Sequence, residues 1–73
     1  MTTKRCDRIK AYLTGHGGEI ISEGDYYFRG KYQGADIFAE FDQFDDRKFN
    51  CLSVKCDDKG LAEKVRREIG NID

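Results

Sequence analysis

Three cysteines and a single histidine are the side chains of this sequence best suited to hold a metal ion. Cys6, Cys51, Cys56 and His16 could together supply the sulfur and nitrogen ligands of a zinc site. Their spacing does not favour one, because there is no Cys-x-x-Cys pair and because Cys51 and Cys56 would lie on opposite faces of a shared strand. We expect free thiols that are buried or half-buried, no disulfide, no metal and no cofactor.

Paired acids and a glycine-rich motif are the other candidates for chemistry. Adjacent acids at residues 45–46 and 57–58 suit a turn and a helix cap better than a general acid and base, because nothing nearby would raise one pKa. The motif GHGG at residues 15–18 has no preceding strand, and neither a Gly-Lys-Ser/Thr nor a Gly-x-Ser-x-Gly sequence is present. We expect a helix-ending turn there, with His16 as a turn residue, and a protein that is not an enzyme.

The segment ADIFAEFDQFDD, residues 35–46, combines five acids and no base with apolar residues at alternate positions. This alternation is typical of a strand with one face on a core. The core positions are Ala35, Ile37, Ala39 and Phe41. The positions that point away from the core are Asp36, Phe38, Glu40 and Asp42, and Asp45 and Asp46 follow in a turn. The same segment therefore predicts a core strand and an acidic surface.

Acidic charge is concentrated in the middle of the chain, although the formal net charge is only −1. Residues 1–18 carry four bases and one acid, residues 19–46 carry two bases and eight acids, and residues 47–73 carry seven bases and five acids. An acidic middle between two basic flanks indicates a polarised surface.

The hydrophobic pattern predicts a helix near each end of the chain. The first covers residues 4–14, and the second follows the acids at residues 57–58. Their apolar stripes are Cys6, Ile9 and Leu13 in the first helix, and Leu61, Val65 and Ile69 in the second. The candidate N-caps are Thr2 or Thr3 and Asp57 or Asp58, and the candidate ends are Gly15 and Gly70.

Between the helices, the period changes to two over residues 26–41, around a tight turn at Gln33 and Gly34. The hairpin pairs Tyr27 with Glu40, Arg29 with Phe38 and Lys31 with Asp36 on one face, and Tyr26 with Phe41, Phe28 with Ala39, Gly30 with Ile37 and Tyr32 with Ala35 on the other. Residues 48–56 return as a third strand, with Leu52, Val54 and Cys56 on the apolar face. Residues 18–22 are either a short lead-in strand or the start of the first long strand.

These elements predict a single α+β domain over residues 1–73, in the order α-β-β-β-α. Its three-stranded antiparallel sheet has two helices packed on one face, because the apolar side of such a sheet must be covered. The sequence has no apolar export signal, no run long enough to cross a bilayer, and an odd number of cysteines. We therefore expect a cytoplasmic protein, and we expect it to be a monomer.

The uncovered face is the candidate functional surface. Its acids could serve only solubility, but like charges clustered on one strand repel, and aromatic side chains among them are typical of recognition surfaces. Lys31 and Lys55 should neutralise the end near Asp36, whereas Glu23 and Asp25 could add to the acidic end. The candidate partner-binding residues are Tyr27, Asp36, Phe38, Glu40, Asp42, Phe44, Asp45 and Asp46. Such a surface predicts a partner whose basic site normally holds phosphates.

The basic flanks support a different interpretation. They contain Lys4, Arg5, Arg8 and Lys10 in the first helix, and Lys64, Arg66 and Arg67 in the second. The order of elements is similar to that of the double-stranded-RNA-binding domain, which implies a small nucleic-acid-binding module that uses basic helices. The sequence departs from that family where the second helix begins, because DDKGLAEKV opens with two acids instead of a lysine cluster.

In size, order of elements and the acidic segment ADIFAEFDQFDD, the whole chain resembles the small anti-CRISPR proteins of phages, particularly inhibitors of type I systems. The resemblance implies a non-enzymatic inhibitor in a bacterial host cytoplasm. It further implies a DNA mimic that binds a nucleic-acid-contacting surface of a CRISPR surveillance complex, such as the large subunit that recognises the target. On this hypothesis, carboxylates replace phosphates opposite lysine and arginine side chains.

Overall fold

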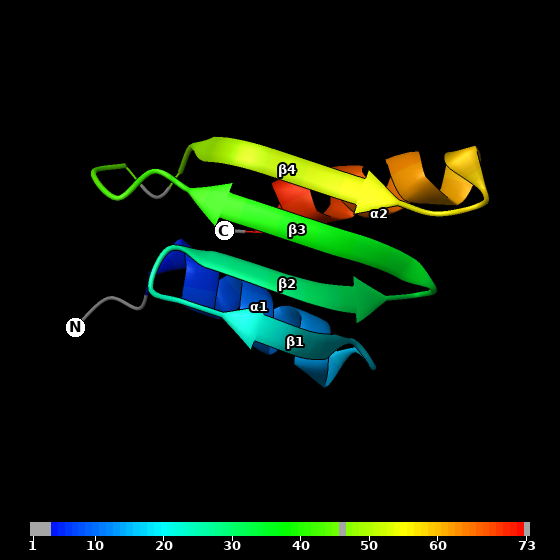
Figure 1. The fold of residues 1–73 in the computed structure, drawn as a ribbon, viewed down its shortest axis with the longest axis horizontal. Coiled ribbons are helices and arrows are strands. Elements are labelled where there is room, and N and C mark those ends of the chain that lie inside the picture. The colour runs from blue at the N-terminus through cyan, green and yellow to red at the C-terminus, as the bar shows by residue number, and fades with distance from the viewer. Residues whose placement is uncertain (1–3, 46, 73) are drawn as a thin grey trace.

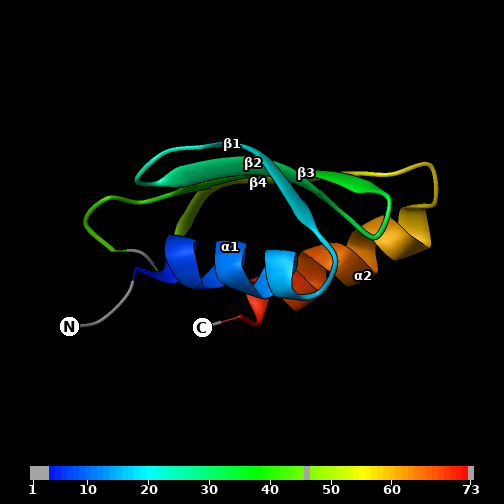
Figure 2. The same ribbon diagram turned by 90° about the horizontal axis from the view of Figure 1, so that it is seen from below.

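The computed structural model describes residues 4–45 and 47–72 of the chain. Within them, the elements are α1 (Arg5–Gly15), β1 (Glu19–Glu23), β2 (Tyr27–Tyr32), β3 (Ala35–Phe41), β4 (Phe49–Lys55) and α2 (Lys59–Gly70). The strands form one antiparallel sheet in the order β1-β2-β3-β4 (Figure 1). Both helices lie on the same face of the sheet, which leaves the other face open (Figure 2). The predicted α+β class and layering are confirmed.

The sheet has four strands, so the prediction of three was wrong. Residues Glu19–Glu23 form a separate edge strand, β1, and the pairing of β1 with β2 shifts between Ile20 and Ser22. This bulge interrupts the alternation that would have identified the strand. Gly30 allows the close approach of β1, because a Cβ atom there would lie 2.3 Å from the carbonyl oxygen of Glu19.

The β2–β3 hairpin has the predicted register at each of its paired positions from Tyr27–Glu40 to Tyr32–Ala35. Its two-residue turn requires a left-handed backbone at both positions, with φ of 53° at Gln33 and 82° at Gly34. The inward side of the hairpin carries Phe28, Tyr32, Ile37, Ala39 and Phe41, which pack with Cys6, Ile9 and Leu13 of α1 and Val65 and Ile69 of α2. The predicted core faces are therefore confirmed.

The helix ends follow from local hydrogen bonding. The GHGG motif is a helix-ending turn, as predicted: Gly17 has a φ of 86°, and the Gly18 amide donates to the carbonyl of Leu13. Asp58 caps α2 by accepting from the amides of Gly60 and Leu61, at 2.9 and 3.2 Å. The N-cap position of α1 is Lys4. The caps predicted at residues 2–3 lie outside the described residues.

Arg5 is buried in the helical layer, with 7% of its surface exposed. Its guanidinium donates to the carbonyl oxygens of Ile72, Arg47 and Gly70 at 2.8, 2.7 and 2.9 Å, and it lies 4.8 Å from the ring centre of Phe49. The side chain therefore joins α1 to the segment before β4 and to the end of α2. Arg5, which the sequence placed in a basic flank that could bind nucleic acid, is therefore not exposed on the helix surface.

A second polar cluster fixes both helices to the sheet. The Glu68 carboxylate of α2 accepts hydrogen bonds from the Tyr12 hydroxyl of α1, at 3.1 Å, and from the Tyr32 hydroxyl of β2. The hydrogen bond between Tyr32 and Glu68 is the main cause that raises the pKa of Tyr32 to about 12, and burial is a smaller cause. None of the helices in the described residues is both long and apolar enough to cross a membrane.

Candidate binding surface

The open face of the sheet carries three cross-strand rows of side chains from β2, β3 and β4. The register gives these rows as Lys31–Asp36–Lys55, Arg29–Phe38–Ser53 and Tyr27–Glu40–Cys51. Directly opposed side chains on one face of a sheet are close enough to interact. The hairpin register thus brings Tyr27, Phe38 and Glu40 together, as predicted, and places Asp36 at the other end of β3.

Charge on this face is balanced instead of uniformly acidic. The predicted placement of Asp36 between Lys31 and Lys55 is confirmed by the register. Arg29, opposite Phe38, adds a third base in the middle of the face. Only the end that carries Glu40 lacks a cross-strand base, because the neighbours of Glu40 are Tyr27 and Cys51. The acidic part of the surface is therefore restricted to that end and to the loop that follows it.

We call this end the acidic rim and define it by Tyr27, Glu40, Asp42, Phe44 and Asp45. A shallow groove is lined by Tyr27, Glu40, Asp42 and Phe44, with Tyr26, Phe41, Gln43 and Asn50. The exposed fractions of Phe44 and Tyr27 are 91% and 38%. The bulge at Asn50, between the pairs Glu40–Cys51 and Phe41–Phe49, ends the regular pairing of β3 with β4 beside this groove.

Two of the rim carboxylates are used by the β3–β4 loop itself. The Asp42 carboxylate accepts from the amides of Phe44 and Asp45, at 2.7 and 3.2 Å, and so holds the backbone that carries Phe44. The Asp45 carboxylate accepts from the Arg47 amide and forms an ion pair with the Arg47 side chain at 3.1 Å. These bonds lower the pKa of Asp45 below its ordinary value. Asp46 lies outside the described residues.

The aromatic candidates differ in exposure. Phe44 and Tyr27 are exposed, as predicted, whereas Phe38 is half-buried. The Phe38 ring lies 6.4 Å from the ring of Tyr27, and the guanidinium of Arg29 lies 5.9 Å from its centre. The flanking side chains thus cover part of Phe38, which the sequence pattern alone does not reveal.

The acids of the β1–β2 connection contribute less than expected. Glu23 forms an ion pair with Lys10 of α1 at 3.5 Å, and Lys10 also pairs with Asp7 at 3.1 Å. Glu23 is therefore directed to the helical layer and not to the acidic rim. Asp25 is exposed in the loop between β1 and β2, at the same end of the sheet as the β3–β4 loop (Figure 1).

The basic residues of the helices are only partly available to a partner. Arg5 is buried, and Lys10 is half-buried and paired. Arg67 forms an ion pair with Glu63 at 3.4 Å. Lys64 and Arg66 are exposed on α2.

The cysteines occupy three different environments. Cys6 is buried, which raises the pKa of its thiol, Cys56 is half-buried, and Cys51 is exposed on the open face. The expectation that all of the thiols are buried or half-buried was therefore wrong for Cys51. In the part of the chain that the structure describes, no three His, Cys, Asp or Glu side chains gather in a way that could hold a metal ion. The His16 ring stacks on Tyr12 at 4.0 Å between ring centres.

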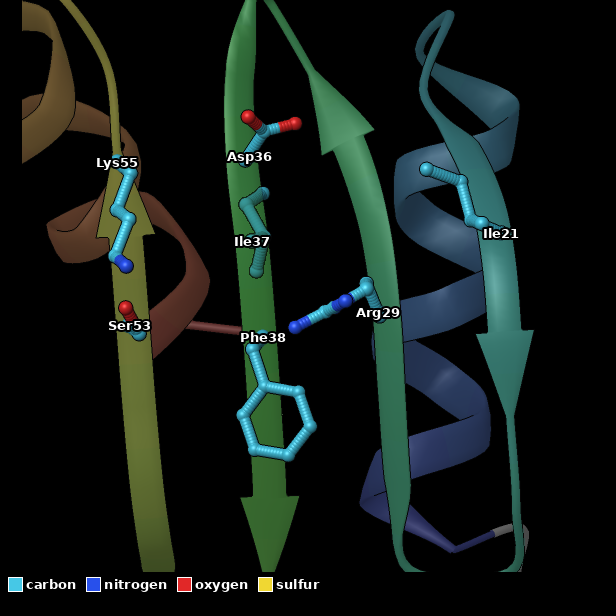
Figure 3. A pocket seen from close by; sticks show the side chains of 7 residues that line it. All are labelled: Ile21, Arg29, Asp36, Ile37, Phe38, Ser53 and Lys55. Carbon is cyan, nitrogen blue, oxygen red and sulfur yellow. The ribbon is translucent and has the colours of Figure 1, made fainter.

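A second hollow covers the middle of the open face and the end that carries Asp36, with a volume of about 400 Å³. It is lined by Ile21, Arg29, Asp36, Ile37, Phe38, Ser53 and Lys55 (Figure 3). Sequence reasoning did not propose Arg29 or Ser53 as binding residues. The predicted pairing of Arg29 with Phe38 was the available signal, because it placed a base beside an outward-facing aromatic ring.

Comparisons of the chain with protein-family models, with curated protein sequences and with solved structures found no match.

Proposed function

We propose that this protein is a non-enzymatic inhibitor that binds a basic, nucleic-acid-contacting protein surface through its acidic rim. The observation that carries the proposal is the pairing of charge with exposed aromatic area around one groove. Glu40 has no cross-strand base, and the exposed side chains of Tyr27 and Phe44 line the same groove. Aromatic anchors beside a carboxylate that has no cross-strand base are suited to binding a basic protein surface.

The loop geometry supports this function by holding its anchor in place. Because the Asp42 carboxylate accepts hydrogen bonds from the amides of Phe44 and Asp45, the backbone of residues 42–45 is held in place before a partner arrives. A fixed anchor loses less conformational entropy on binding than a mobile one. The Glu40 carboxylate then meets a lysine or arginine of the partner as a phosphate would, by charge-assisted hydrogen bonds.

The partner class comes from the resemblance to type I anti-CRISPR proteins. On this proposal, the acidic rim covers a DNA-contacting site of the surveillance complex, on the subunit that recognises the target. The carboxylates compete with DNA for the same bases, so the protein acts stoichiometrically and is not consumed.

The test is competition between this protein and target DNA for a purified type I surveillance complex. The wild-type protein should prevent DNA binding at stoichiometric concentrations, and added salt should weaken the inhibition. Glu40→Lys and Phe44→Ala should each weaken the inhibition by about tenfold or more. Glu63→Lys, a charge reversal on the exposed side of α2, is the matched control and should inhibit like the wild type.

The other candidate function, nucleic-acid binding through the basic helices, makes opposite predictions. It requires direct binding to duplex RNA or DNA that is lost in an Arg66→Gln, Arg67→Gln variant and kept or improved in Glu40→Lys. Equal inhibition of the surveillance complex by the wild type and Glu40→Lys would refute the acidic-rim proposal. A pull-down from bacterial lysate, compared between the same two variants, extends the test to other basic partners.

A further inference from the structure

The hollow at the Asp36 end of the open face combines two cations, a hydroxyl group and an aromatic ring. Figure 3 shows Arg29 reaching from β2 toward Phe38, and Lys55 extending along β4 toward the hydroxyl of Ser53. Asp36 closes the far end, and Ile21 of β1 forms one side. The side chains come from all four strands, so the sheet as a whole positions them.

The two cations of this hollow outnumber its one acid, Asp36. In the described residues, the ion pairs join Lys10, Arg47 and Arg67 to acids, and neither Arg29 nor Lys55 takes part in one. Asp36 lies opposite Lys55 in the register but forms no ion pair with it. Arg29 of β2 and Lys55 of β4 flank β3 on the same face, and this arrangement favours an anion that accepts hydrogen bonds from one or both of them.

The Phe38 ring gives the hollow a flat apolar side. Figure 3 shows the ring lying along the sheet with one face turned toward the viewer, on the open side. The Tyr27 ring continues this surface at 6.4 Å. A planar group that lies on Phe38 would have its anionic substituent within reach of Arg29, whose guanidinium is 5.9 Å from the ring centre.

We propose that this hollow binds one nucleotide unit of a single-stranded nucleic acid. The base stacks on Phe38, and the phosphate accepts hydrogen bonds from Arg29 and Lys55, with Ser53 as a further donor. An acidic peptide would satisfy the cations but would leave the aromatic face unused, so a nucleotide fits the combination better. The site extends from the middle of the open face to its Asp36 end, and Phe38 lies beside Tyr27 of the acidic rim. The inference does not depend on the function proposed for that rim.

The test is fluorescence anisotropy with labelled oligo(dT) and oligo(rU) probes of about ten nucleotides, in about 50 mM salt. The wild-type protein should bind, and Phe38→Leu, which keeps an apolar side chain but removes the ring, should weaken binding by about tenfold. Arg29→Gln and Lys55→Gln should each lower the slope of log affinity against log salt by about one. Urea unfolding of the same variants shows that they are folded.

Two controls separate this site from the other surfaces. Lys64→Gln, on the exposed side of α2, should leave affinity and salt slope unchanged, and Glu40→Lys should bind the probes at least as well as the wild type. Glu40→Lys also distinguishes the two proposals, because it should lose inhibition of the surveillance complex while it keeps the nucleotide site.

Three results would overturn the inference. The first is absence of probe binding by the wild type at low salt, and the second is full binding by Phe38→Leu. The third is an oligo-glutamate peptide that binds as tightly as the nucleic acids and is equally sensitive to Arg29→Gln, because the site would then select carboxylates and not nucleotides.

Discussion

Arg5 and Arg29 lie on opposite sides of the same sheet and have opposite uses. Arg5, on the covered side, donates to three carbonyl oxygens and lies against Phe49. Arg29, on the open side, contacts the Phe38 ring and forms no ion pair in the described residues. In one case the guanidinium holds the chain together, and in the other its donors face solvent. A residue type therefore says little about function until its hydrogen-bond partners are known.

The comparison predicts the largest loss of stability for Arg5→Leu. This change leaves the carbonyl oxygens of Arg47, Gly70 and Ile72 without their shared donor, and we expect the free energy of unfolding to fall by about 3 kcal/mol. Urea unfolding measures the change, with Arg66→Leu on the exposed side of α2 as the control. A loss below about 1 kcal/mol would show that the hydrogen bonds of Arg5 stabilise the fold no more than a surface contact does.

The covered side also limits the backbone at Gly30, where β1 approaches β2. Gly30→Ala brings a Cβ atom to 2.3 Å from the carbonyl oxygen of Glu19, so β1 must shift. We expect a loss of about 2 kcal/mol in unfolding free energy. Amide hydrogen exchange should show lower protection in β1 than in the β2–β3 hairpin. Unchanged protection of β1 would show that the edge strand adapts without cost.

A smaller effect is expected at the tyrosine–glutamate cluster. Tyr32→Phe removes one hydrogen bond to Glu68 and should cost about 1–2 kcal/mol at neutral pH. Because the pKa of Tyr32 is raised to about 12 from 10.0, its contribution is complete below pH 10 and is lost as the pH rises through 12. The difference in stability between the wild type and Tyr32→Phe should therefore shrink between pH 10 and 12. If the stability difference between the wild type and Tyr32→Phe stays constant from pH 10 to 12, the Tyr32 hydroxyl is not the donor to Glu68.

The smallest effect is expected on the open side. Arg29→Gln and Lys55→Gln should each change the free energy of unfolding by less than about 0.5 kcal/mol, because neither side chain forms an ion pair in the described part of the chain. Thermal and urea unfolding measure this change. A loss as large as that of Arg5→Leu would remove the contrast between the two arginines and make Arg29 a structural residue.

The register of the β2–β3 hairpin could be predicted because strict alternation and the Gln33-Gly34 turn specify the same pairing. The apolar stripes of both helices were predictable for the same reason, since helical period and burial agree at Ile9 and Val65. The edge strand β1 could not be predicted, because its bulge breaks the alternation over a strand of only five residues.

The candidate site was less accessible to prediction than the core. Sequence alternation placed Glu40 and Tyr27 on the open face, but it does not report how a carboxylate is used. Asp42 and Asp45 looked like free surface charge, yet their oxygens bind loop amides and Arg47. These hydrogen bonds depend on the backbone conformation of the loop, which cannot be predicted from the hydrophobic periodicity of the sequence.

Arg5 is made before the residues whose carbonyl oxygens accept its hydrogen bonds. Its three carbonyl acceptors lie 42, 65 and 67 residues further along the sequence. During synthesis on the ribosome, Arg5 emerges well before residues 70–72 exist, so its guanidinium remains hydrated until the end of α2 is released. The helical layer can therefore close only after translation of α2 is complete, and contacts of this sequence separation form slowly. Until then the part of the apolar side that α2 covers, over β3 and β4, is open to chaperones and proteases.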